Sequence, residues 1–242
     1  MRSCGAIALA LSSTFLSAQS DTTAKASPWS IGAFGLVDQC YRTLVNADND
    51  PDVDQLIDHR DQDEIRYTRC SGMLMVQHDL GEHWQLAAGL GYFSDGFRTK
   101  DHSDWQAIGN PADDPALNDL TTRSFSQYEY MALPIMGSYR LGHARCQPFA
   151  ALGIAPEVLV KDLYIFETEQ NGHVHRSEGH DATYRDLGLA TCGQIGAAYR
   201  LSKHFALRLA ANGRYGLVNI IDAPITAHLW SIGGLFGAVY HL

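Results

Sequence analysis

The stretch at residues 128–157 reads YEYMALPIMGSYRLGHARCQPFAALGIAPE and contains two strand-length segments joined by a short turn. Every second residue from 131 to 139 is apolar or glycine, whereas the alternate set from 130 to 140 mixes small, polar and charged residues. Successive side chains of a strand point to opposite faces, so this segment has one apolar face and one mixed face. Residues 142–147 supply a turn, and Pro148 begins the second strand, where its missing N–H costs least. The stretch therefore predicts two antiparallel strands.

Similar turns recur along the chain at Leu80, Leu141 and Leu201, and longer polar stretches lie between them. Short turns at one end and long loops at the other are typical of an outer-membrane barrel, with the short turns in the periplasm. An even number of strands closes an antiparallel sheet without a free edge, which hydrocarbon requires. We predict eight strands, at residues 29–42, 65–78, 84–98, 125–141, 148–165, 183–200, 205–218 and 227–242.

The facing of the predicted strands separates a membrane barrel from a soluble one. In 205–218, Arg208 and Arg214 alternate with a leucine-rich face. A soluble barrel or sandwich would turn the apolar face inward, and alternation alone fits both arrangements. Inward arginines suit the polar lumen of a membrane barrel better than a soluble core. The sequence therefore favours an all-β protein, a single eight-stranded antiparallel transmembrane β-barrel with short periplasmic turns and long extracellular loops. Strands one, two and five alternate too irregularly for their facing to be assigned.

Three segments also carry a family resemblance. YMALPIM at 130–136, followed by SYR at 138–140, resembles the Tyr-Leu-Glu-Ile-Pro-Leu strand of the PorT-like outer-membrane β-barrel proteins of Bacteroidetes-type bacteria. PFAALG at 148–153 and YGLVNI at 215–220 are similar to the next and the penultimate strands of that family. The chain departs from the pattern at Ala132, where the family usually has Glu, and at Leu242, where it usually ends on an aromatic residue. The resemblance implies an outer-membrane barrel that serves as an accessory component of a secretion, uptake or surface-attachment assembly.

The N-terminus and the overall charge indicate the compartment. Arg2, an apolar run at 5–11 and small residues up to Ala18 have the layout of a secretory signal peptide; the alternative is a buried N-terminal helix. We expect a signal peptide at 1–20 and an outer-membrane β-barrel domain at 21–242. With 27 acidic and 18 basic residues, the formal net charge is −9, which argues against a nucleic-acid partner.

Two clusters contain metal-ligand residue types. Asp50, Asp52 and Asp54 are spaced like the opening of a calcium-binding loop, but the glycine and the bidentate glutamate of such a loop are missing. The alternative is a solvated acidic loop that holds divalent cations weakly or bridges to lipopolysaccharide. His173, His175 and His180 have side chains that suit zinc, copper or nickel, against the alternative of ordinary loop histidines. These are weak candidates, and we expect no cofactor and no dedicated metal site.

The charged residues of the predicted strands form a second kind of site. The predicted lumen charge cluster consists of Arg140, Asp186, Arg200, Arg208 and Arg214. The side chains of an eight-stranded barrel nearly fill its interior, so a salt-bridged plug is favoured over a catalytic cluster. No nucleophile elbow, phosphate loop or dinucleotide fingerprint is present, and we predict no enzyme and no catalytic residues. A symmetrical hairpin register would make Cys40 and Cys70 neighbours, which predicts a disulfide in an oxidising compartment.

The predicted function follows from a filled barrel with long loops. We expect a protein of the bacterial outer membrane that acts as a membrane anchor or accessory subunit of an envelope assembly through its loops and barrel wall. Its expected partners are outer-membrane lipid, lipopolysaccharide and a protein of the cell envelope. The alternatives are a narrow channel or small-solute transporter, and an outer-membrane enzyme such as a lipase or acyltransferase.

Overall fold

The structure, a computed structural model, describes residues 27–102, 120–142, 144–180, 184–221 and 223–242. The expected signal peptide and the expected start of the sixth strand at residue 183 lie outside these residues. The elements, in chain order, are β1 (Trp29–Asn46), α1 (Pro51–Asp63), β2 (Glu64–Asp79), β3 (Trp84–Thr99), β4 (Thr121–Ala132), β5 (Ile135–Arg140), β6 (Cys146–Gln170), β7 (His173–Gly179), β8 (Leu187–Arg200), β9 (Phe205–Gly216) and β10 (Ile225–His241).

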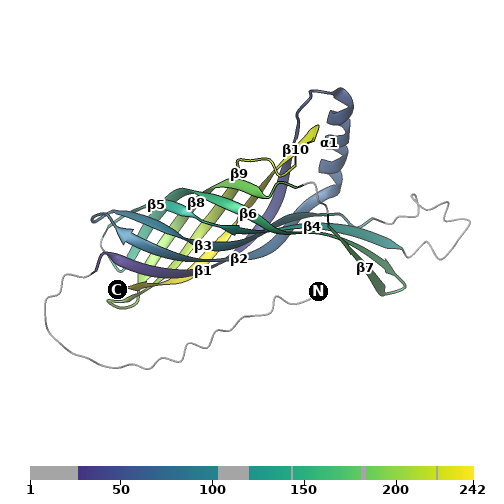
Figure 1. Cartoon of the computed structure of the whole chain (residues 1–242). Helices are drawn as coiled ribbons and strands as arrows, with labels where there is room; N and C mark the ends of the chain where they lie inside the picture. The colour runs from purple at the N-terminus through teal and green to yellow at the C-terminus, as the bar shows by residue number, and fades with distance from the viewer. Residues whose placement is uncertain (1–26, 103–119, 143, 181–183, 222) are drawn as a thin grey trace, which may run out of the picture.

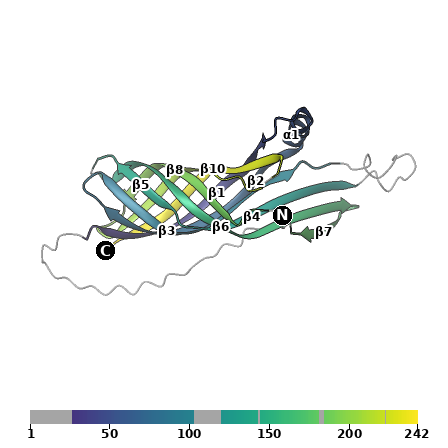
Figure 2. The same cartoon turned by 45° about the horizontal axis from the view of Figure 1, so that its top comes forward.

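The strands form one antiparallel sheet that closes into a barrel (Figures 1 and 2). Its order is β2-β1-β10-β9-β8-β6-β4-β3, and β3 pairs back with β2. β4 and β5 are two halves of one strand, since both pair with β3 on one side and β6 on the other. The predicted eight-stranded antiparallel barrel is therefore confirmed, and β7 is an addition outside the ring.

The break between β4 and β5 falls at Leu133 and Pro134, inside the segment predicted as a single strand. Proline has no N–H to donate to a ladder, so regular pairing stops there. The sheet stays continuous because the Gly89 N–H donates to the Pro134 carbonyl at 3.1 Å and the Leu133 N–H donates to the Pro156 carbonyl at 2.9 Å.

The two ends of the barrel differ. The turn end carries the short connections between β2 and β3, β5 and β6, and β8 and β9, together with the beginning of β1 and the end of β10. The loop end carries α1 and the β6–β7 hairpin, which project beyond the ring (Figures 1 and 2). The predicted layout of short turns opposite longer connections is present.

Both projecting elements replace stretches that the sequence analysis treated as loops. The acidic stretch forms α1 because Asp50 caps the helix, accepting from the Asp52 N–H at 3.0 Å, and Pro51 occupies the first turn. β7 folds back on β6 through Asn171 and Gly172, whose φ angles are 51° and 75°. Positive φ at both central residues gives the tight turn that asparagine followed by glycine favours.

The outer wall is apolar and banded by aromatic residues. Leu74, Leu90, Leu152, Leu209 and Phe236 are among its exposed side chains. An aromatic row surrounds the turn end, formed by Trp29, Trp84, Tyr139, Tyr199, Phe205 and Tyr240. A second row toward the loop end includes Tyr92, Tyr215 and Trp230.

The spacing of the two rows fits the hydrocarbon layer of a bilayer. Trp230 and Tyr240 both lie on β10, separated by roughly 33 Å along the strand. A strand tilt of ~40° reduces this to about 25 Å along the barrel axis, the height of the apolar band of outer-membrane barrels. In the described part of the chain, no helix combines the length and hydrophobicity that crossing a membrane would need.

The register of β1 and β2 excludes the predicted disulfide between Cys40 and Cys70. Tyr67 lies opposite Cys40, and Val37 lies opposite Cys70. The observed pairing therefore differs by three residues from the symmetrical hairpin that was assumed. Because an odd shift turns a side chain to the other face, Cys40 is buried in the lumen while Cys70 is exposed on the outer wall.

Candidate functional site

The lumen of the barrel is the site where charged side chains converge, and it is filled. Polar side chains occupy its loop-end half and its turn-end half, and an apolar layer lies between them. The apolar layer contains Phe34, Leu36, Met75, Met136, Phe149 and Leu235. These side chains are buried and belong to one connected apolar cluster.

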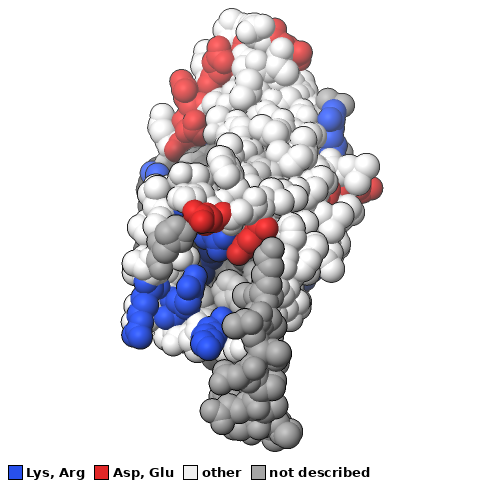
Figure 3. Space-filling view, turned by 90° about the vertical axis from the view of Figure 1, so that its left-hand side faces the viewer, with Lys and Arg blue, Asp and Glu red and all other residues white. Residues whose placement is uncertain are grey.

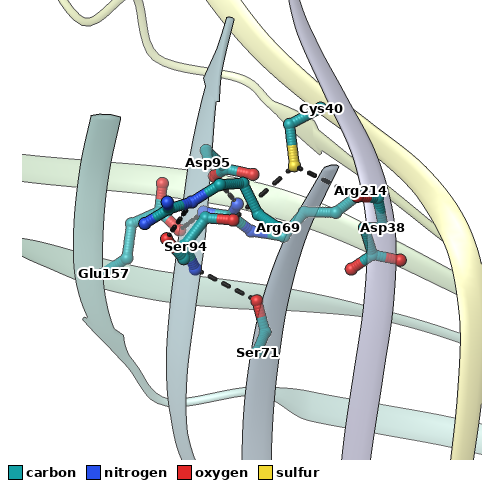
Figure 4. A network of polar contacts seen from close by, with 8 residues as sticks. All are labelled: Asp38, Cys40, Arg69, Ser71, Ser94, Asp95, Glu157 and Arg214. Atoms are coloured by element: carbon teal, nitrogen blue, oxygen red, sulfur yellow. Dashed lines mark hydrogen bonds and ion pairs between the residues drawn. The ribbon is translucent and has the colours of Figure 1, made fainter. Parts of the chain in front are cut away.

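The loop-end half is built around Arg214 of β9 (Figure 4). Its guanidinium forms ion pairs with Asp95 of β3 and Glu157 of β6, and all three side chains are almost fully buried. Arg214 also lies over the rings of Phe93 and Tyr130, at 5.1 and 5.5 Å from their centroids. We call Arg214, Asp95, Glu157 and Asp38 the lumen ion network. It joins four strands that are far apart in the sequence.

Asp38 of β1 completes the network without pairing directly with Arg214. Its side chain is only 3% exposed. Its Oδ1 atom has no hydrogen-bond partner in the described part of the chain. Gly233 lies opposite Asp38, and a Cβ at this glycine would stand 2.5 Å from the same oxygen. The network thus contains three carboxylates and one guanidinium in a closely packed space.

Beside the network, the pairing of β2 with β3 is interrupted. Regular pairing stops at Arg66 and resumes at Gly72. Side chains supply hydrogen bonds where the backbone ladder is interrupted. The Ser94 N–H donates to Ser71 Oγ at 3.0 Å, and Arg69 Nε donates to Ser94 Oγ at 2.7 Å. The Cys40 thiol lies 3.6 Å from the Ser94 carbonyl oxygen (Figure 4). This polar patch closes the wall where backbone pairing does not.

The turn-end half contains Arg208 of β9 and Arg140 of β5. Arg208 stacks over Phe149, 4.0 Å from the ring centroid, and its Nη2 donates to Gln85 Oε1 at 3.4 Å. Arg140 Nη2 pairs with Asp79 Oδ1 at 2.9 Å. Gln85 Nε2 donates to the same Asp79 oxygen at 2.9 Å.

The structure places the predicted lumen charge cluster in three groups. Arg208 and Arg214 face inward and are buried, in separate halves of the lumen. Arg140 and Arg200 lie at the turn end, where both line a small cavity. Asp186 does not face the lumen, as the predicted cluster would require. Asp186 precedes β8 and is exposed, and Arg200 ends that strand roughly 45 Å away along its length.

The weak metal candidates do not form a ligand set. Asp50 caps α1, and Asp54 accepts from Asn46 Nδ2 at 2.8 Å. His173 and His175 lie exposed on β7, and His180 Nδ1 contacts the Asp162 carbonyl oxygen at 2.6 Å. Among the residues that the structure describes, no group of three or more His, Cys, Asp or Glu side chains is arranged to hold a metal ion.

The sequence analysis missed the carboxylates that surround Arg214. Asp38, Asp95 and Glu157 lie on strands whose alternation contains many small residues, so their facing was harder to assign. The signal was present in β6, where Ala151, Gly153, Ala155 and Glu157 share one face and Leu152, Ile154 and Val158 share the other. Reading the small residues as lumen-facing would have placed Glu157 inside.

Comparisons with known proteins agree with this architecture. Residues 18–222 match the family model described as outer membrane protein beta-barrel domain. A search of curated protein sequences gives no match.

Solved structures give distant matches. Neisserial surface protein A is 10% identical, covering 90% of this chain and 99% of its own, with a TM-score of 0.44. OprG from Pseudomonas aeruginosa is 10% identical, covering 90% of this chain and 98% of its own, with a TM-score of 0.42. The attachment invasion locus protein Ail of Yersinia pestis is 11% identical, covering 89% of this chain and 99% of its own, with a TM-score of 0.36.

Proposed function

Because this chain belongs to the outer membrane protein beta-barrel domain family, as the match over residues 18–222 shows, we propose that it anchors an envelope assembly in the membrane. It is a β-barrel protein of the bacterial outer membrane. Within that family we propose a relationship to the PorT-like proteins of Bacteroidetes-type bacteria, because the strand at 130–140 resembles one of theirs. The proposed role is that of an accessory subunit in secretion, uptake or surface attachment, without catalysis.

The filled lumen is the observation that carries this proposal. A transporter needs a continuous wet path, whereas Phe34, Met75 and Phe149 contribute to a buried apolar layer between the two polar halves. On the loop-end side of that layer, Arg214 is held by two carboxylates from different strands. Buried ion pairs hold side chains in place, which suits a rigid anchor.

The projecting elements offer the surface for a protein partner. β7 pairs with β6 on one side, and the residues from His173 to Glu178 are exposed. A free strand edge presents unpaired backbone N–H and C=O groups that can bind an added strand of another chain. The acidic helix α1 projects from the same end of the barrel as this hairpin (Figures 1 and 2). In the proposed setting, lipopolysaccharide surrounds that end, and lipid chains cover the wall between the two aromatic rows.

Reconstitution into planar bilayers tests the anchor against the channel. We expect no stable conductance from the purified protein. A large, reproducible conductance would contradict the filled lumen and would establish the channel instead.

Crosslinking in native outer membranes tests the partner. A photoreactive residue at Val174 on β7, 52% exposed, is expected to give one defined protein adduct. The matched position is Leu152 on the lipid-facing wall, 71% exposed, which is expected to crosslink to lipid. Lipid adducts alone at both positions would contradict the proposed role of the hairpin.

A further inference from the structure

We propose that the turn end of the lumen binds a small anion, namely a phosphate group, between Gln77, Arg140, Arg200 and Arg208. This site is independent of the anchor function proposed above. It lies on the opposite side of the apolar layer from the lumen ion network, and its residues come from β2, β5, β8 and β9.

A cavity of about 30 Å³ opens at the turn end, and its lining includes Gln77, Gln85, Arg140, Arg200, Arg208 and His241. A single water occupies about 10–15 Å³ measured in this way, so the cavity admits more than one water-sized atom. Arg200 lines the cavity and is exposed, so the cavity reaches the surface.

The buried donors around this cavity exceed the acceptors. Gln77 is 1% exposed, and its Nε2 atom has no acceptor within the described residues. Arg140 Nε is likewise buried without an acceptor in this part of the chain. Arg208 is 7% exposed, and its Nη2 makes a long hydrogen bond to Gln85 Oε1 at 3.4 Å. A guest that accepts hydrogen bonds and donates none would satisfy all three groups.

The positive charge around the cavity is only partly compensated. Three arginines line it, and the carboxylate beside them is Asp79, which is already engaged with Arg140 and Gln85. Among the described residues, no carboxylate forms an ion pair with Arg200 or Arg208. Figure 3 looks onto this end of the barrel and shows Lys and Arg side chains gathered on one part of it.

A buried charge without a partner is costly, so the fold gains stability when a counter-charge enters. Water cannot supply that charge. A phosphate group can, because its oxygens accept from guanidinium and amide donors in short, charge-assisted hydrogen bonds. The small volume means that one or two oxygens enter while the rest of the group remains at the opening near Arg200. Two sources fit this chemistry: free inorganic phosphate, and the phosphate of a phospholipid head group in the periplasmic leaflet.

Thermal unfolding of the refolded full-length protein in non-ionic detergent, followed by tryptophan fluorescence, tests the site. Inorganic phosphate is titrated at constant ionic strength, and the bulky zwitterionic buffer HEPES serves as the phosphate-free reference. We expect a saturable rise in the unfolding midpoint. Arg208→Gln is expected to weaken the apparent affinity by about tenfold or more, since hydrogen bonds to charged groups are individually strong. Arg200→Gln removes an exposed side chain that the folded barrel does not need, so it keeps the test valid if Arg208→Gln fails to fold.

The matched control is Lys203→Gln, which removes the same charge from an exposed turn at the same end of the barrel. It is expected to leave the phosphate response unchanged. If Lys203→Gln and Arg200→Gln weakened the phosphate response equally, the response would reflect general charge screening, and the proposed site would be overturned.

A second arm replaces inorganic phosphate with phosphatidylglycerol in mixed micelles. A response to the lipid alone, lost in Arg200→Gln, would assign the head group as the ligand. Absence of a saturable response in both arms would overturn the proposal.

Discussion

Removing Arg214 from the lumen should destabilise the barrel more than almost any other single change. The guanidinium is buried and bridges Asp95 and Glu157, with Asp38 nearby. Arg214→Met keeps most of the volume but leaves the two carboxylates without a counter-charge. Breaking a buried ion pair from one side costs about 3–5 kcal/mol, a large part of the ~5–15 kcal/mol that stabilises a typical domain.

The cost comes from the orphaned carboxylates rather than from the lost arginine. Combining Arg214→Met with Asp95→Asn and Glu157→Gln removes the guanidinium and its two ion-pair partners together, and Asp38 is the same in the single and the triple variant. Neutral replacements of a whole buried ion pair are often tolerated, so we expect the triple variant to recover to within about 1–2 kcal/mol of the natural protein. The control is Arg145→Met, an exposed arginine at the turn end, with an expected change below about 0.5 kcal/mol.

Urea-induced unfolding in lipid vesicles, followed by tryptophan fluorescence, measures these free energies. Gel migration before and after boiling reports separately whether each variant forms a closed barrel. A cost below about 1 kcal/mol for Arg214→Met would refute the reasoning. A triple variant as unstable as the single one would also refute it, because the loss would then come from packing.

Three further outcomes test the register and the packing. Cys40 is buried beside Ser94, so a maleimide should label the exposed Cys146 in the folded barrel and leave Cys40 unmodified. Peptide mapping without reductant should find no disulfide between Cys40 and Cys70. Gly89→Ala should lower the free energy of unfolding in urea by about 3 kcal/mol or more, since its Cβ would stand 2.0 Å from the Leu74 carbonyl oxygen. Gly137→Ala should leave that free energy nearly unchanged, because no heavy atom lies within 4 Å of its Cβ. Gly172→Val places a branched side chain at a φ of 75°, so amide exchange should quicken in β7 while the free energy of unfolding of the barrel stays unchanged; slow exchange throughout β7 would contradict the tight turn.

The ring of strands was readable from the sequence because each strand carries its own local signal. In β9, Leu207 and Leu209 alternate with Arg208, and the same pattern gives both the strand and its facing. The broken strand at Pro134 was predicted as continuous because its flanking residues keep the alternation through the break. The β6–β7 hairpin was missed because residues 167–179 are mostly polar on both faces, although asparagine and glycine at the turn are a recognisable signal.

The contacts inside the lumen could not be read in the same way. The register of β1 with β2 depends on how α1 is accommodated, and a shift of three residues was enough to move Cys40 and Cys70 to opposite faces. The partners of Arg214 come from β3 and β6, which are not its neighbours in the sheet. Contacts across a barrel are set by the stagger of all its strands together, and no single segment encodes that quantity.

The apolar layer has a consequence for how the two ends of the molecule act on each other. Phe34, Met75 and Phe149 belong to the buried apolar cluster, and Arg208 lies over the Phe149 ring. Arg208 and Arg214 nevertheless lie on the same strand, β9, and face the same interior. We therefore expect an anion at the turn end to have little influence on the lumen ion network. Any coupling to the projecting hairpin would have to pass through the strands themselves, whose hydrogen-bonded ladders resist displacement along their length. We therefore expect the proposed phosphate site and the proposed contacts of the hairpin to act independently.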